Sequence, residues 1–186
     1  IIDTPYAIAV YHAFLHRRKV RSAVGFVNVG SQGSWFSIFT SRSMLNKRIT
    51  LKQDTLVTNS TLGTRRMDEI RRNMMYQSFM YFVDPDYFFS EEFFNEYYYW
   101  DYFSTDDTES QELKRVADSL HVLVLAALSK RKQPLDTIEI FGGKTNLSEI
   151  RDSIKSASRV NISRTMDGNT SAAIGAMIIG AKISGK

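Results

Sequence analysis

A glycine-containing turn at residues 142–145 (Gly-Gly-Lys-Thr) is the stretch of the chain best suited to bind an anion. It follows a run typical of a strand (137–141) and precedes a predicted helix, and backbone N–H groups at a helix start suit a phosphate. The complete nucleotide-binding loop needs another glycine five residues before Gly143, where Ile138 stands. The pattern predicts a phosphate loop of Gly142, Gly143, Lys144 and Thr145, with an ordinary strand-to-helix turn as the alternative.

A second turn, Gly30-Ser31-Gln32-Gly33, separates two runs of β-forming residues (22–29 and 34–42). Hairpin turns use such residues without any ligand, so the turn is a weaker anion site than 142–145. We predict a β-hairpin here. A helix that begins at Ser34 is the alternative for the second arm, because Trp35, Ile38 and Phe39 also fit helical spacing.

Lysines and arginines gather in four clusters in regions that are poor in acidic residues. If two or more clusters converge, they form a phosphate-binding face for nucleic acid or for an anionic membrane surface, with an affinity that falls steeply with salt. The alternative is that they only solvate helix ends. The predicted anion-binding residues are Arg17, Arg18, Lys19, Arg21, Lys47, Arg48, Arg65, Arg66, Arg71, Arg72, Lys130, Arg131 and Lys132.

The histidines and carboxylates are weaker candidates for a functional site than the basic clusters. His12 and His16 have the spacing of a shared metal site, but no glutamate lies between them and arginines follow, so we predict no metal and no cofactor. Glu92 and Glu96 could act as a general acid and base on a carbohydrate held by nearby aromatic rings, although acidic residues on a helix face are usually solvated.

Charge and aromatic residues are unevenly distributed. Residues 1–72 carry twelve basic and four acidic groups, residues 73–113 carry ten acidic and no basic groups, and residues 114–186 carry twelve basic and six acidic groups. Fifteen of the twenty-three aromatic residues lie in residues 76–103. Opposite charges on one molecule suit head-to-tail association, or the segments neutralise one another within the fold.

The aromatic block and the tail at 165–186 are the predicted self-association surfaces, so we expect a homo-oligomer. The block holds more aromatic surface than one small core needs, and the tail is rich in Gly, Ala, Ile and Met. The predicted self-association residues are Phe89, Phe93, Phe94, Tyr97, Tyr98, Trp100, Ile178 and Ile179.

The composition fits one domain over residues 1–186, with 165–186 as an assembly arm. Cysteine is absent, which excludes disulfides and thiol chemistry and favours an intracellular, reducing compartment. No run is long and apolar enough to predict a transmembrane segment.

The elements that would position these residues predict an α+β fold, in which a small antiparallel sheet of N-terminal hairpins packs with four to five helices and a C-terminal strand or arm. Helices are expected at 4–18, from Thr64, from a cap at Ser90, from a cap at Ser110, and from a cap at Asn146. Residues 48–52 and 55–58 predict a third strand or a second hairpin, and residues 160–163 a last strand. The tail could be a strand or a helix.

Together these features predict a non-catalytic structural or scaffolding protein that self-associates and binds an anionic partner. Viral matrix and nucleocapsid components have a similar composition. The alternative is an enzyme acting on a phosphorylated or carbohydrate substrate through the 142–145 turn or the acidic, aromatic cleft.

Overall fold

The computed structural model describes residues 3–16, 21–43, 49–79, 107–131 and 134–184. The chain forms two compact units, one made of Ile1–Thr64 with Val116–Lys186 and the other of Arg65–Arg115. The predicted aromatic block falls almost wholly outside the described residues. Each unit is considered by itself.

The first unit is built on a five-stranded sheet with the order β3-β2-β1-β4-β5. β1 and β2 form the predicted hairpin, and β3 continues the antiparallel pairing. β4 runs parallel to β1, and β5 runs parallel to β4. The strands are β1 (Arg21–Val29), β2 (Ser34–Ser43), β3 (Ile49–Asn59), β4 (Thr137–Phe141) and β5 (Ile162–Ser163).

β1 is the central strand and is buried on both faces. Val24 and Phe26 point to one face of the sheet, while Val27 and Val29 point to the other, and all four are at most 3% exposed. Gly25 is closely packed, because a Cβ there would lie 3.0 Å from the ring of Phe36. A strand of β-branched and aromatic residues that is apolar on both faces needs a layer of helices on each side.

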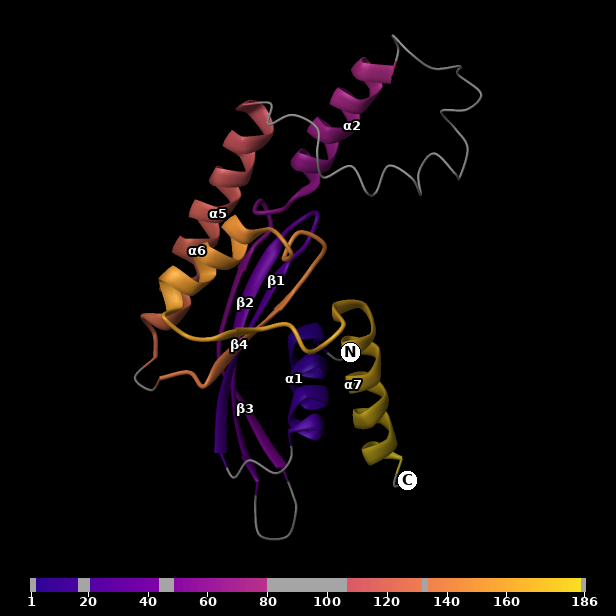
Figure 1. Ribbon diagram of the computed structural model, residues 1–186. Coiled ribbons are helices and arrows are strands. Elements are labelled where there is room, and N and C mark those ends of the chain that lie inside the picture. The colour runs from indigo at the N-terminus through magenta and orange to yellow at the C-terminus, as the bar shows by residue number, and fades with distance from the viewer. Residues whose placement is uncertain (1–2, 17–20, 44–48, 80–106, 132–133, 185–186) are drawn as a thin grey trace. The chain divides into compact units, whose positions relative to one another are not determined.

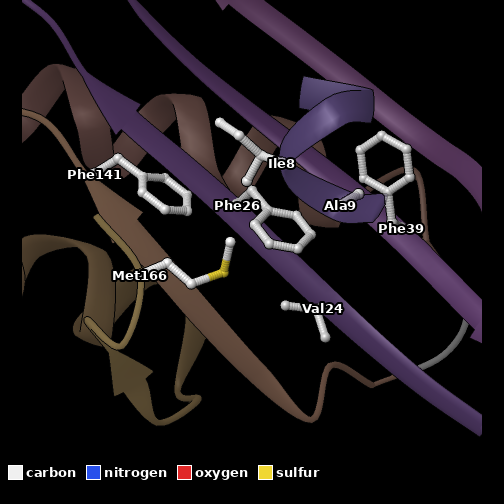
Figure 2. Close-up of a cluster of buried hydrophobic side chains, with 7 residues drawn as sticks. All are labelled: Ile8, Ala9, Val24, Phe26, Phe39, Phe141 and Met166. Carbon is white, nitrogen blue, oxygen red and sulfur yellow. The ribbon is translucent and has the colours of Figure 1, made fainter. Parts of the chain in front are cut away.

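Helices α1 (Thr4–Leu15) and α7 (Gly168–Ile183) form one of these layers (Figure 1). Figure 2 shows the core beneath α1, where Ile8 and Ala9 of the helix meet Phe26 of β1 and Phe39 of β2. Phe26 packs edge-on against Phe39, at a centroid distance of 5.9 Å. The two helices approach closely because small residues line their contact, including Gly175 of α7.

Helices α5 (Asp107–Leu128) and α6 (Ser148–Ser158) lie on the other side of the sheet (Figure 1). Val116, Leu120 and Val124 give α5 a fully buried stripe at helical spacing. Ser153 of α6 donates a hydrogen bond to the carbonyl of Ala117, which joins the two helices. The strands therefore have a core on each face.

The second unit contains α2 (Arg65–Phe79) and the first turns of α5. Arginines of α2 pair with glutamates: Arg66 lies 3.9 Å from Glu112, and Arg71 pairs with Glu109. Arg115 also holds Glu112, with Nη2 2.7 Å from Oε1. The described part of this unit is thus joined by ion pairs between α2 and α5.

The α+β class, the first hairpin and the short strand at 137–141 are confirmed, and the last strand, predicted at 160–163, is confirmed over 162–163. The sheet is mixed, because β4 and β5 add parallel pairs to the N-terminal strands. Residues 49–59 form one strand, since a bulge opposite Ile38 and Phe39 takes up the polar Gln53 and Asp54 without a turn. The tail is the helical alternative, α7, and it packs on α1.

Two predicted caps are wrong. α5 begins at Asp107, so Ser110 lies inside the helix. Asp107 and Glu109 stand in its first turn, where the helix dipole favours acidic residues. α6 begins at Ser148 after Leu147, and Asn146 belongs to the preceding turn. The first helix ends at Leu15, earlier than expected.

Gly175→Ala should destabilise the first unit, because a Cβ there would lie well inside van der Waals contact of the Ala7 carbonyl. Overpacking of this kind costs about 2 kcal/mol in the free energy of unfolding, measured by urea denaturation. Gly180→Ala is the control, since a Cβ at that helical position meets nothing within 4 Å. The control should gain about 0.5–1 kcal/mol. Equal stability of the two variants would contradict the close packing of α1 on α7.

Candidate anion-binding site

The carboxyl ends of β1 and β4 lie at the same edge of the sheet, because these adjacent strands are parallel and Asn28 pairs with Phe141. From this edge the chain continues to opposite sides of the β1–β4 pair, since β1 leads to β2 on one side and β4 leads to β5 on the other. Ligands of open α/β sheets bind outside the carboxyl ends of strands at such a divergence. The two turns singled out from the sequence both follow these strand ends.

The turn after β1 is held by backbone hydrogen bonds. The Gly30 N–H donates to the Gly33 carbonyl at 3.0 Å, which closes the turn. The Gly30 carbonyl accepts from Thr64 N–H at 3.1 Å, which joins the turn to the segment after β3. Ser31 and Gln32, at the tip of the turn, are exposed.

The segment at 59–64 packs against that turn. The Asn59 carboxamide accepts from the N–H groups of Thr61 and Leu62, at 3.0 and 3.1 Å, and so folds the chain back. Ser34 donates to the Leu62 carbonyl at 2.7 Å. A Cβ on Gly63 would overlap the Ser31 carbonyl, so only glycine allows this approach.

The turn after β4 meets the end of β1. Gly142 has φ of 108°, and a Cβ there would overlap the Val29 carbonyl. Glycine is therefore required twice, for its backbone conformation and for the close approach. Thr145 is fully buried, and its hydroxyl donates to the Gly142 carbonyl at 2.8 Å. Three turns thus meet at one edge of the sheet.

Gly143 differs from the other glycines of the three turns. It is exposed, a Cβ on it would meet nothing within 4 Å, and its φ lies outside the range that favours glycine. Within the described part of the chain, the N–H groups of Gly143, Ser31 and Gln32 donate no hydrogen bond. Backbone N–H groups of exposed residues that donate no hydrogen bond are the groups with which turns bind phosphate, so these adjacent turns are the candidate anion site.

The structure brings together only some of the predicted anion-binding cations. Arg21, Lys130 and Arg131 line one hollow at the other end of the sheet. Arg65, Arg66 and Arg71 lie on α2 beside glutamates, and Arg72 shares that helix. The others lie outside the described residues: Arg17, Arg18, Lys19, Lys47, Arg48 and Lys132.

Of the predicted self-association residues, Ile178 and Ile179 lie on α7 and are half-buried, and the six aromatic ones fall outside the described residues. His12 is buried, with its ring edge-on to Phe26 and 4.3 Å from the ring of His16. In the described ranges, no three histidine, cysteine or acidic side chains gather as metal ligands do. No helix in those ranges has the length and apolar character of a membrane span.

Sequence reasoning missed two parts of these sites. Residues 55–58 were predicted as a strand and Thr64 as the start of a helix, so the contact of Gly63 with the turn after β1 was not predicted. It also left Lys52 and Asp54 out of the basic clusters, although both line the hollow. The signal for Gly63 was a lone glycine between Asn59 and a helix start, which is typical of a tight loop.

No family model matches the sequence, and the comparison with curated proteins found no match. The site must therefore be interpreted from its geometry.

Glu112 provides a pH test of the ion pairs in the second unit. Its hydrogen bond with Arg115 lowers the pKa of the Glu112 carboxyl, and the charges of Arg115 and Arg66 act in the same direction against burial. A lowered pKa means that this contribution to stability is fully present above the ordinary pKa of 4.5 and is lost as the pH falls through the lowered pKa of the folded state. Glu112→Gln should cost about 1 kcal/mol in the free energy of unfolding at pH 7 and less at pH 3, as measured by urea denaturation. An equal cost at both pH values would contradict the ion pair.

Proposed function

We propose that the chain binds a phosphorylated small-molecule ligand at the turns that follow β1 and β4. The observation that carries the proposal is Gly143, an exposed glycine that neither packing nor backbone conformation requires, whose N–H donates no hydrogen bond within the described residues. A phosphate could approach the backbone there as it could at no residue with a side chain. Binding, and not turnover, is the activity proposed.

The residues of the turns would have two different roles in binding phosphate. Ser31, Gln32 and Gly143 supply exposed N–H donors, and Lys144 supplies a positive charge next to them. Gly63 and Gly142 hold the turns together through backbone contact, so they shape the site without touching a ligand. Charge-assisted hydrogen bonds to phosphate are about twice as strong as neutral ones, which makes Lys144 the main source of affinity.

Gly143→Ala should weaken the binding of pyrophosphate by about tenfold while the melting temperature stays unchanged, because the added methyl group would occupy the space of the phosphate. Lys144→Ala should weaken it by a similar factor through the lost charge. Isothermal titration calorimetry with pyrophosphate and with ADP measures both effects.

Lys155→Ala is the matched control, since Lys155 is an exposed lysine on α6 and not part of the three turns. It should bind as the unsubstituted protein does. The proposal fails if the unsubstituted protein binds neither pyrophosphate nor ADP, or if Gly143→Ala and Lys144→Ala bind as the control does.

The scaffolding function predicted from the sequence is our second candidate, favoured by one observation on α7. Met177 is 65% exposed and Ile183 is 79% exposed on this helix, although its other side packs on α1. Large exposed apolar side chains on a helix suit contact with a second copy of the chain. The contact would thus use the outer face of α7 in addition to the half-buried Ile178 and Ile179.

Met177→Lys combined with Ile183→Lys should convert a self-associating protein into a monomer, because each substitution charges the exposed apolar surface of α7. Size-exclusion chromatography with light scattering measures the mass over a range of protein concentrations. Lys182→Ala, which changes an exposed residue between them, should leave the mass unchanged. A protein that is monomeric before substitution would remove this candidate.

A further inference from the structure

A basic hollow of about 550 Å³ lies at the amino-terminal end of β1, away from the three turns. Arg21 begins β1, and Arg42 and Lys52 stand on the neighbouring strands β2 and β3. Lys130 and Arg131 reach it from the segment that follows α5. Five cations from four separate parts of the chain therefore line one concave surface.

The sheet register places like charges next to one another. Arg21 and Arg42 are direct cross-strand partners, and Thr40, one alternate position along β2, is opposite Lys52. Like charges directly opposite each other on a sheet are destabilising. Stability of the strands alone does not explain this arrangement, whereas an anion bound between the cations would.

Asp54 offsets only part of this charge. It is the one carboxylate among the described residues that line the hollow. Its Oδ2 lies 3.6 Å from Arg131 Nη1, and its Oδ1 lies 3.8 Å from Lys52 Nζ. Thr40 donates a 2.6 Å hydrogen bond to the same carboxylate. With five cations and one carboxylate, the lining has a net charge of +4.

The size of the hollow indicates the kind of anion. Small-molecule sites occupy about 300–1,000 Å³, and this hollow falls within that range. A net charge of +4 among the lining residues matches a compact ligand with several phosphates better than a single phosphate. The hydroxyls of Thr40 and Thr50 add hydrogen-bonding groups among the cations.

We propose that this basic hollow binds a compact polyphosphorylated ligand of the inositol polyphosphate class, either free or as a lipid headgroup. The site is distinct from the proposed phosphate site at the turns, because the nine residues of β1 separate the two by about 27 Å. One small ligand cannot span both. The two proposals can therefore fail separately.

Fluorescence anisotropy competition with inositol hexakisphosphate tests the proposal, together with co-sedimentation on phosphatidylcholine vesicles with and without phosphatidylinositol bisphosphate. Lys52→Glu should weaken binding by about tenfold or more, since it reverses one charge in the hollow. The Lys52 side chain is 83% exposed, so the variant should fold normally. Binding of the free ligand alone identifies a soluble ligand, and additional vesicle binding identifies a headgroup.

Arg42→Gln supplies a second readout. Without ligand this variant should be at least as stable as the unsubstituted protein, because the repulsion between Arg21 and Arg42 is relieved. With inositol hexakisphosphate it should gain less in melting temperature than the unsubstituted protein does. A loss of stability without ligand would show that Arg42 is structural and overturn the argument.

One control separates the hollow from the net charge of the protein. Lys155→Glu removes a lysine outside both sites and should bind inositol hexakisphosphate normally. Equal weakening by Lys155→Glu and Lys52→Glu would show that only net charge matters and would overturn the proposal. So would single-stranded RNA that binds more tightly than inositol hexakisphosphate and is unaffected by Lys52→Glu.

Discussion

Strand β1 pairs with β2 on one side and with β4 on the other, and its side chains are buried on both faces of the sheet. Such a strand has no exposed face at which polar groups could act, so its two ends are the places where it meets solvent. The Gly30–Gly33 turn follows its carboxyl end, and Arg21 is the residue at its amino end. Both candidate sites are consequences of this one buried strand.

The parallel pairing of β1 with β4 determines what the carboxyl end can hold. Backbone from three separate turns meets there at distances that only Gly63 and Gly142 permit. These contacts require glycine at positions 63 and 142, and Gly142 also needs it for its backbone conformation. Gly143 is the glycine of the turn after β4 that neither packing nor backbone conformation requires. At the amino end of β1 the side chains matter and not the backbone. The strand register holds Arg21 next to Arg42 although their charges repel.

Local patterns predicted the parts of the fold that depend on neighbours in sequence. The β-forming runs and turn residues of 22–42 predicted the β1–β2 hairpin, and the apolar spacing within 4–18 predicted α1, which ends at Leu15. The parallel β1–β4 pairing could not be predicted, because it joins strands more than a hundred residues apart and no local signal encodes that contact. For the same reason, the turns at 30–33 and 142–145 were recognised separately but not as neighbours. Cation clusters were visible, but only strand register shows that Lys52 joins Arg21 and Arg42.

The central claim is that the turns after β1 and β4 form one anion site, and amide chemical shifts test it most directly. A titration of ¹⁵N-labelled protein with pyrophosphate reports each N–H separately. We expect the amides of Ser31, Gln32 and Gly143 to shift together and saturate with one dissociation constant, while the packed Gly175 amide stays unchanged. Shifts confined to residues outside these two turns, or different dissociation constants at Ser31 and Gly143, would contradict the account.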